Sequence, residues 1–247
     1  MSFVGDVALV TGSTRGIGAA TAMLLAERGA HVLVTGRDAR RGMRVVDTIQ
    51  GAGGTAEFIA AVLGSADQCA TLANHAIVVA GRVDILVNNA AIASFGPTAA
   101  VPEDEFDASF AVNVKAPYYL VGALAPRMVE RGRGAIVNVT TTVATRGTAQ
   151  SAVYASGKAA LNHLTRCWAA EYGPCGVRVN AVAPGPTFTE DAHVALGADE
   201  MSVMSRVPAR RLAQPFEIAR TIAYLASDEA SFINGAILPA DGGRTAV

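Results

Sequence analysis

The stretch VALVTGSTRGIG, from Val7 to Gly18, decides the fold. It begins with a short apolar run of strand length, continues through a turn with the glycine spacing GxxxGxG, and leads into a helical segment from about residue 17. In a strand–turn–helix unit, small residues let the backbone approach a pyrophosphate, which then faces the helix N-terminus. A glycine-rich turn without a ligand has the same local pattern, so this stretch needs support from the rest of the chain. The residues predicted to line a dinucleotide here are Gly12, Ser13, Thr14, Arg15, Gly16, Ile17 and Gly18.

Outside that stretch, short apolar runs alternate with longer amphipathic segments. The runs are continuous in Val, Ile, Leu and Ala, which is typical of strands covered on both faces. Such alternation predicts a single-domain α/β fold: a Rossmann-type, doubly wound parallel sheet of about seven strands flanked by helices. Residues 184–208 lack clear periodicity and are predicted to form a substrate lid within the one domain, 1–247. We expect strands at 7–11, 31–35, 56–62, 85–89, 135–140, 177–183 and 236–239, and helices at 17–28, 39–50, 66–80, 103–131, 151–172 and 214–227.

The composition narrows the class of function. The chain has 247 residues, of which 51% are hydrophobic and 17% charged, which excludes a disordered chain. Its 20 basic and 21 acidic residues give a net charge of −1, which argues against a nucleic-acid partner or an anionic membrane surface. No apolar run is long enough to span a bilayer, and the four histidines lack metal-ligand spacing, so we expect no metal. The first residues do not resemble a signal peptide, so we expect reduced cysteines, a cytoplasmic location and a small-molecule substrate.

The end of the second predicted strand, Thr35-Gly36-Arg37, bears on the choice of cofactor. An acidic residue here accepts the ribose hydroxyls of NAD and repels a 2′-phosphate. The chain instead has Gly36, and Arg15 and Arg37 lie on the two loops that would flank the adenine ribose, where a guanidinium suits a phosphate. We therefore expect NADP. The alternative is NAD, with both arginines solvated and Asp38 in the place of the acid.

One of only two lysines in the chain lies four residues after a tyrosine, in the segment YASGK (154–158). Residues i and i+4 of a helix share a face, so we expect the ammonium of Lys158 beside the phenol of Tyr154. A phenol titrates near pH ~10, and a neighbouring cation lowers that pKa. Thr141 follows the fifth predicted strand, and ligands of parallel sheets bind at the carboxyl ends of strands. The pattern predicts acid–base chemistry on a substrate oxygen in that crevice.

Taken in order, these motifs resemble those of the short-chain dehydrogenase/reductase family over the whole chain, with a general shape closest to 3-oxoacyl-carrier-protein-reductase-like and small alcohol dehydrogenase members. The resemblance implies an NAD(P)-dependent carbonyl reductase or alcohol dehydrogenase that assembles as a homotetramer. The segments that carry it are TGSTRGIG (11–18), NNAA (88–91), Asn113, Thr141, YASGK (154–158), PGPTFT (184–189) and ADGG (240–243).

The resemblance also implies a role for each matching residue. Tyr154 would be the general acid in reduction and the base in oxidation. Lys158 would lower the pKa of Tyr154 and hold the nicotinamide ribose. Thr141 would hydrogen-bond the substrate carbonyl, and Asn113 would hold a water that links Lys158 to solvent. The other residues implied to bind the cofactor are Asn89, Ala90, Pro184, Gly185, Thr187 and Thr189.

Three residues depart from the family pattern. Thr141 stands where serine is usual, and its extra methyl stiffens χ1 and narrows the pocket; Thr142 is the alternative hydroxyl. Ala91 replaces a glycine near the cofactor, and Ala61 stands where an aspartate usually contacts adenine. The fold and reaction class are unaffected, but these departures keep open a nucleotide-binding sensor with little catalysis.

The substrate is the least determined part of the prediction. Residues 92–95, 143–149 and 188–204 are expected to shape the pocket; Ala, Val, Phe and Met dominate there, and no cluster of arginines is expected. This composition favours an apolar ketone or alcohol. The leading hypothesis is therefore an NADP(H)-dependent enzyme that reduces a ketone, or oxidises a secondary alcohol, by hydride transfer. The alternative is an NAD-dependent dehydrogenase of a sugar, polyol or steroid alcohol.

Overall fold

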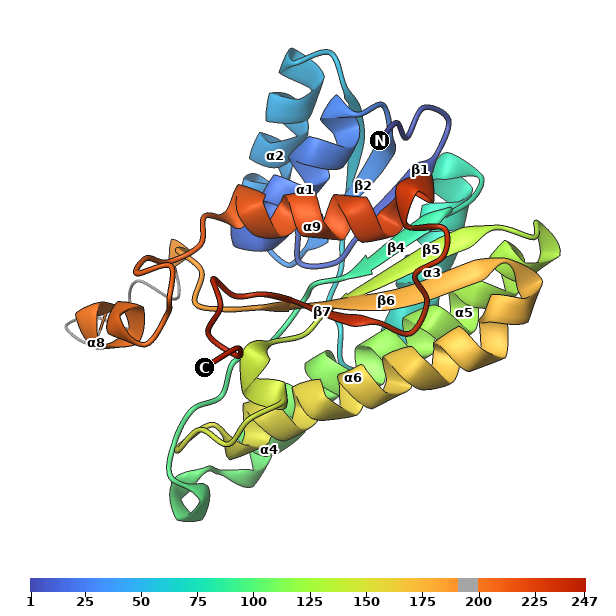
Figure 1. Cartoon of the computed structure of the whole chain (residues 1–247). Coiled ribbons are helices and arrows are strands. Elements are labelled where there is room, and N and C mark those ends of the chain that lie inside the picture. The colour runs from blue at the N-terminus through green and yellow to red at the C-terminus, as the bar shows by residue number, and fades with distance from the viewer. Residues whose placement is uncertain (191–199) are drawn as a thin grey trace.

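The computed structural model describes residues 1–190 and 200–247. Seven parallel strands form one sheet in the order β3-β2-β1-β4-β5-β6-β7, so the chain starts near the centre and winds to one edge and then to the other (Figure 1). This confirms the single-domain, doubly wound sheet predicted from the sequence. The strands are β1 (Val7–Val10), β2 (His31–Gly36), β3 (Thr55–Ala60), β4 (Ile85–Asn88), β5 (Gly134–Val139), β6 (Val177–Pro184) and β7 (Ile237–Ala240).

Helices cover both faces of the sheet, and each face buries its own apolar cluster (Figure 1). Side chains of β1 alternate between the two: Ala8 and Val10 join the cluster under α1, α2 and α9, whereas Val7 and Leu9 join the cluster under α3, α5 and α6. This is why the strand is apolar at every position. The helices are α1 (Gly16–Glu27), α2 (Ala39–Gly51), α3 (Ala66–Ala80), α4 (Glu103–Phe110), α5 (Ala116–Glu130), α6 (Ala152–Tyr172), α8 (Glu200–Ser205) and α9 (Pro215–Ala226).

The long helix predicted over 103–131 is divided in the structure. A π-helical turn, Ala111–Lys115, separates α4 from α5. The apolar pattern runs on through this wider turn, so periodicity alone does not reveal it. The extra residue in the turn accompanies a fully buried Asn113, whose polar side chain faces the end of β4. Such π turns are frequent at functional sites.

The register of the sheet places the loops that carry the predicted site residues side by side. Val10 pairs with Val87, Asn88 with Asn138, and Val139 with Val182. The loops that follow β1, β4, β5 and β6 therefore emerge together at the carboxyl edge of the sheet, where parallel sheets bind ligands.

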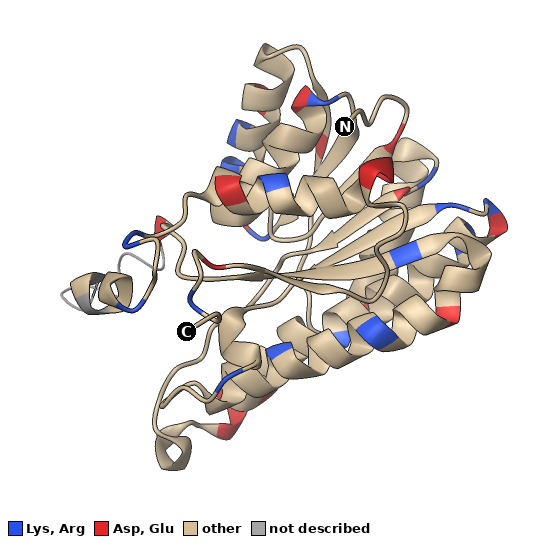
Figure 2. Ribbon diagram, viewed as in Figure 1, with Lys and Arg blue, Asp and Glu red and all other residues tan. Residues whose placement is uncertain are grey.

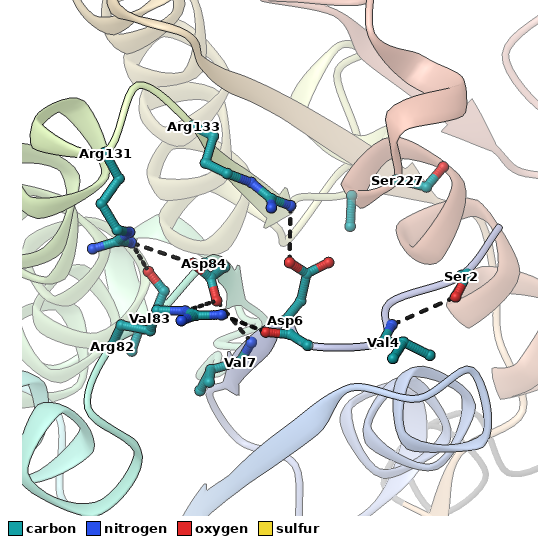
Figure 3. A network of polar contacts seen from close by, with 12 residues as sticks. Ser2, Val4, Asp6, Val7, Arg82, Val83, Asp84, Arg131, Arg133 and Ser227 are labelled. Carbon is teal, nitrogen blue, oxygen red and sulfur yellow. Dashed lines mark hydrogen bonds and ion pairs between the residues drawn. The ribbon is translucent and has the colours of Figure 1, made fainter.

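The opposite edge of the sheet carries a network of ion pairs (Figure 3). Buried Asp84 accepts hydrogen bonds from the backbone N–H of Val7 and from Nε of Arg82, both at 2.9 Å, and Arg131 lies 3.5 Å from its other oxygen. The network joins the amino ends of β1 and β4.

Elsewhere the charged residues lie mainly on the outer faces of helices and in loops (Figure 2). Within the described ranges no helix is both long and apolar enough to cross a bilayer.

Candidate active site

The glycine turn between β1 and α1 is held close to the end of β4. Gly12 and Gly16 adopt φ values of +63° and +55°, which favour glycine. A Cβ on Gly12 would lie 2.9 Å from Cα of Ala90. A Cβ on Gly18 would lie 2.4 Å from the carbonyl oxygen of Gly12 and 2.5 Å from Nδ2 of Asn89. The turn therefore leaves no room for side chains at these positions, and its backbone is open to a ligand at the start of α1.

Asn89, predicted to line the cofactor, holds this turn in place. Its Nδ2 donates to the carbonyl oxygens of Thr11 at 2.9 Å and Gly12 at 3.0 Å. The hydroxyl of Thr11 in turn accepts from the backbone N–H groups of Asn89 and Ala90. The hydroxyl of Ser13 also makes two hydrogen bonds, because it donates to Val10 O at 2.7 Å and accepts from the backbone N–H of Thr35, within β2, at 2.9 Å. These hydrogen bonds fix the conformation of the glycine turn.

The end of β2 bears on the choice between NADP and NAD. Gly36 packs against Thr14, since a Cβ at position 36 would lie 2.6 Å from Cγ2 of that threonine. Arg37 is exposed. Asp38 caps α2 by accepting from the backbone N–H of Arg41 at 3.0 Å, and this hydrogen bond holds the pKa of Asp38 below its usual value. Asp38 thus already has a structural use in the folded chain.

Tyr154 and Thr141 come together from α6 and the end of β5. The Thr141 hydroxyl lies close enough to act on the pKa of the Tyr154 phenol, and the ring of Phe95 lies 5.5 Å from the ring of Tyr154. Burial raises the pKa of Tyr154 to about 12, and the Thr141 side chain acts in the opposite direction. Thr142, the alternative hydroxyl, is buried at 3% exposure and begins a short 3-10 turn. The geometry favours Thr141 as the hydroxyl that accompanies the tyrosine.

Lys158 lies one turn further along α6 and is fully buried. Its Nζ donates to the carbonyl oxygen of Val139 at 2.7 Å, at the end of β5, and burial lowers the pKa of Lys158 to about 7. The sequence predicts a lowered pKa for Tyr154 beside a charged lysine. In the protein alone, burial acts on both groups and favours the neutral form of each, so the phenol pKa moves upward.

Asn113 is fixed by three hydrogen bonds around the π turn. Its Oδ1 accepts from the backbone N–H of Ile92 at 3.1 Å, and its Nδ2 donates to Ile92 O at 2.7 Å and to Oγ of Ser109 at 3.0 Å. The side chain therefore ties the loop after β4 to α4. Gly157, on α6, packs against this asparagine. The predicted role in holding a water stays a prediction.

A buried polar ladder behind the site was not recognised in the sequence. Asn88 donates to Asn138 at 2.8 Å, Asn138 donates to Thr165 at 2.9 Å, and these residues come from β4, β5 and α6. The ladder fixes α6 against the centre of the sheet. The only sequence signal for it is a polar residue inside each of two otherwise apolar strands.

The loop after β6 contacts both the glycine turn and the C-terminal segment. A Cβ on Gly16 would lie 3.3 Å from Cγ2 of Thr189, and a Cβ on Gly185 would lie 2.7 Å from Cα of Asp241. Thr187 folds back on its own loop by donating to Gly185 O at 3.0 Å. The structure therefore brings PGPTFT beside the glycine turn. Of the predicted lid, 191–199 lie outside the described residues, and its role stays a prediction.

A group of arginines was not recognised in the sequence. Arg146, Arg206 and Arg244 follow α-helical and β-strand segments near the carboxyl edge of the sheet, and the first two lie close enough to act on the charge of the third. They are separated by about 40 to 60 residues along the chain, which is why the cluster is invisible in the sequence. In the described part of the chain, no group of three or more His, Cys, Asp or Glu residues is arranged to hold a metal ion.

Comparison with known proteins agrees with this geometry. Residues 12–245 match a family model described as enoyl-(acyl carrier protein) reductase. A cis-4-hydroxycyclohexanecarboxylate dehydrogenase of Sinomonas cyclohexanicum is 44% identical over 253 residues, which cover all of this chain and 99% of the relative.

Solved structures agree over the same length. A short chain dehydrogenase/reductase family protein is 46% identical with a TM-score of 0.92, covering 100% of both chains. A gluconate 5-dehydrogenase from Burkholderia cenocepacia J2315, in complex with NADP and tartrate, is 31% identical with a TM-score of 0.94, covering 100% of this chain and 97% of that one. A 7α-hydroxysteroid dehydrogenase complexed with NADH and 7-oxo glycochenodeoxycholic acid is 35% identical with a TM-score of 0.94, covering 98% and 95%. Residues 12–245 match the family model and the solved structures match over the whole length, so the chain belongs to the short-chain dehydrogenase/reductase family of oxidoreductases.

Proposed function

We propose that this protein is an NADP(H)-dependent oxidoreductase that interconverts a ketone and a secondary alcohol by hydride transfer. The observation that carries the proposal is the proximity of the Tyr154 and Thr141 side chains at the carboxyl end of β5, one helical turn from buried Lys158. The glycine turn (11–18), Asn89, Ala90 and the loop 184–189 are the residues that would hold the cofactor. A bound nicotinamide would supply or accept the hydride.

In this proposal the chain's own residues handle the proton. As a ketone is reduced, negative charge develops on its oxygen, which needs a proton and a hydrogen-bond donor at that moment. Tyr154 gives the proton and Thr141 donates the hydrogen bond. A charged Lys158 stabilises the phenolate left behind, and its pKa of about 7 means that little free energy is needed to charge it near neutral pH. In this proposal Asn113 holds the water that returns the proton.

The preference for NADP rests on charge. Arg15 and Arg37 lie on the loops after β1 and β2, and Asp38, the acid that would favour NAD, already caps α2. A 2′-phosphate meets favourable charge there. NAD is the alternative, with a sugar, polyol or steroid alcohol as substrate, because the related 7α-hydroxysteroid dehydrogenase is complexed with NADH.

The same proposal includes assembly and location. Helices α5 and α6 present a groove lined in part by Val114, Tyr118, Tyr119 and Leu164, and the two tyrosines are 53% and 42% exposed. We propose that a second copy of the chain covers this face within a homotetramer, as the family resemblance implies. The three free thiols fit the reducing cytoplasm, which we propose as the location.

The test is an assay of NADPH oxidation, with NADH in parallel, against ketones, 3-oxoacyl thioesters, diketones and 4-oxocyclohexanecarboxylate. We expect turnover with NADPH on at least one compound and a smaller kcat/KM with NADH. Tyr154→Phe is expected to lower kcat by about 100-fold or more, whereas Tyr224→Phe, on the remote helix α9, keeps the activity. Full activity in Tyr154→Phe would refute the proton assignment. Binding of NADPH with no turnover on any compound would favour the sensor hypothesis instead.

A further inference from the structure

Three arginines from distant parts of the chain lie close enough together for two of them to act on the charge of the third. Arg146 lies on the loop after β5, five residues beyond Thr141; Arg206 directly follows α8; and Arg244 lies in the turn after β7. Burial lowers the pKa of Arg244, and the like charges of Arg146 and Arg206 lower it further. Like charges gathered in this way repel one another, so the arrangement is unfavourable until an anion neutralises it.

Arg244 is the centre of this group, and its side chain has unused hydrogen-bonding capacity. The residue is only 8% exposed, and its buried Nε has no partner in the described chain; the buried Nε of Arg146 is in the same situation. None of the three guanidiniums forms an ion pair with a described acidic residue. A buried donor without a partner is costly, and buried guanidiniums are normally paired. Two such donors at one place indicate a missing acceptor.

The nearest acid does not fill this role. Asp241 acts on the charge of Arg244, but its oxygens are occupied by its own turn. Oδ1 accepts from the backbone N–H of Gly243 at 2.9 Å, and Oδ2 accepts from the N–H and the hydroxyl of Thr245 at 2.8 and 2.7 Å. These bonds shape the turn that carries Arg244 and leave its guanidinium fork available.

The turn that carries Arg244 contacts two segments that the sequence predicts to line the substrate and the cofactor. The backbone N–H of Ala209 donates to Gly242 O at 3.0 Å, and a Cβ on Gly243 would lie 3.1 Å from Pro208, so the turn rests on the segment that follows α8. On its other side it touches the loop after β6 at Gly185. The cluster is therefore bounded by the loop of Thr141, the end of the predicted lid and the loop predicted to line the cofactor.

We propose that Arg146, Arg206 and Arg244 form an anion site that binds the carboxylate of the substrate, so that the enzyme acts on small oxo or hydroxy carboxylic acids. This inference rests on the proposed function for the reaction itself and adds the substrate class. A guanidinium binds a carboxylate through two parallel hydrogen bonds, which orients as well as attracts it. With the carboxylate fixed there, the oxo or hydroxyl group of the same molecule is held toward Tyr154 and Thr141, which lowers the entropic barrier to reaction.

The first test measures binding without chemistry. Cyclohexanecarboxylate and its neutral analogue cyclohexanecarboxamide are titrated against the NADP⁺-loaded full-length protein by saturation-transfer NMR or calorimetry. We expect the carboxylate to bind at least tenfold more tightly than the amide, and Arg244→Gln and Arg146→Gln each to abolish most of that difference. Arg166 is an exposed arginine on α6, and Arg166→Gln is the matched control. We expect this variant to retain the tighter binding of the carboxylate. If Arg244→Gln does not fold, the more exposed Arg146→Gln gives the result alone.

The second test uses turnover of 4-oxocyclohexanecarboxylate and its methyl ester, and its outcomes separate the two proposals. Ketone reduction with no preference for the free acid would leave the proposed function standing and overturn the anion site. Arginine-dependent carboxylate binding without turnover of any compound would leave the anion site standing and overturn the function.

Two further readouts exclude other anions. If Arg146→Gln and Arg244→Gln weaken NADPH binding as much as carboxylate binding, the cluster serves the cofactor's phosphates and the proposal fails. A change in the mass of the assembly in these variants would assign the cluster to a contact between copies, which also overturns it. Inorganic phosphate is the remaining anion to compare; we expect it to compete with the carboxylate only weakly, and phosphate binding tighter than carboxylate binding would contradict the assigned substrate class.

Discussion

Lys158 and Tyr154 are the residues whose protonation the fold alters most, and burial acts on both. It lowers the pKa of Lys158 to about 7 and raises that of Tyr154 to about 12. In the absence of a cofactor, burial therefore favours the neutral forms of both groups at slightly alkaline pH. A cofactor or substrate that favours the ammonium of Lys158 or the phenolate of Tyr154 must therefore offset this effect of burial.

Replacing Lys158 tests this electrostatic cost. The unfolded chain has a lysine pKa of about 10.4, so between pH 7 and that value the unfolded state binds more protons and stability rises with pH. The penalty is fully present below pH 7. Lys158→Met should therefore stabilise the cofactor-free protein relative to wild type at pH 6, by up to roughly 4 kcal/mol, and this advantage should shrink as the pH approaches 10.

The measurement is the free energy of unfolding in urea at pH 6, 8 and 9.5. Loss of the hydrogen bond to Val139 O adds a constant offset, so the slope of the difference with pH is the readout. Lys115→Met removes the other lysine, which is exposed, and should show no such slope. If the difference in unfolding free energy between Lys158→Met and wild type does not vary with pH, burial does not penalise the charged form of Lys158.

At the scale of the element, the turn between β1 and α1 depends on close packing with the end of β4. Gly18→Ala would place a methyl carbon against the carbonyl of Gly12 and the amide of Asn89. We expect a loss of roughly 1–3 kcal/mol in stability and weaker NADPH binding, because the backbone that faces the phosphates must shift. Gly51→Ala, in a helix with nothing within 4 Å of the new methyl, is the control and should keep both.

Thermal unfolding and a fluorescence titration with NADPH measure the two effects. Unchanged NADPH affinity in Gly18→Ala would mean that the turn does not bind the cofactor. Loss of stability with unchanged affinity would identify the packing as purely structural.

Local patterns in the sequence were enough to predict the elements and much of the site. Apolar runs and amphipathic segments located the strands and most helices, and the i, i+4 spacing brought Tyr154 and Lys158 to one face of α6. The π turn at 111–115 was not predicted, because apolar periodicity continues through it. The sequence also did not predict the direction of the pKa shift of Tyr154 or the cluster around Arg244. Both depend on burial and on contacts between distant segments, which a linear pattern does not contain.

For the whole molecule, the exposed face of α5 and α6 is the surface through which we propose that copies of the chain assemble. Tyr118 is 53% exposed, and its ring lies 6.3 Å from that of Trp168. Leaving such aromatic surface in water is unfavourable, whereas a second copy would bury it. We expect wild-type protein to have a mass near four times the 25.3 kDa of one chain.

Tyr118→Glu should reduce the tetramer to dimers that do not use this face. The mass of the assembly is measured by light scattering after size-exclusion chromatography. Val78→Glu places the same charge at an apolar position of α3 that is 82% exposed, and it should leave the assembly intact. A tetramer that survives Tyr118→Glu, or a wild-type monomer, would contradict the proposed use of this face.

The single tryptophan of the chain gives that face a spectroscopic signature. Trp168 is 4% exposed on α6, the helix that also carries Tyr154 and Lys158. Excitation at the red edge of its absorption therefore yields emission from one defined position, at the short wavelengths typical of an apolar surrounding. A red shift of this emission reports that α6 has separated from the core, and its lifetime reports on the neighbouring ring of Tyr118, so the molecule carries its own optical probe without a label.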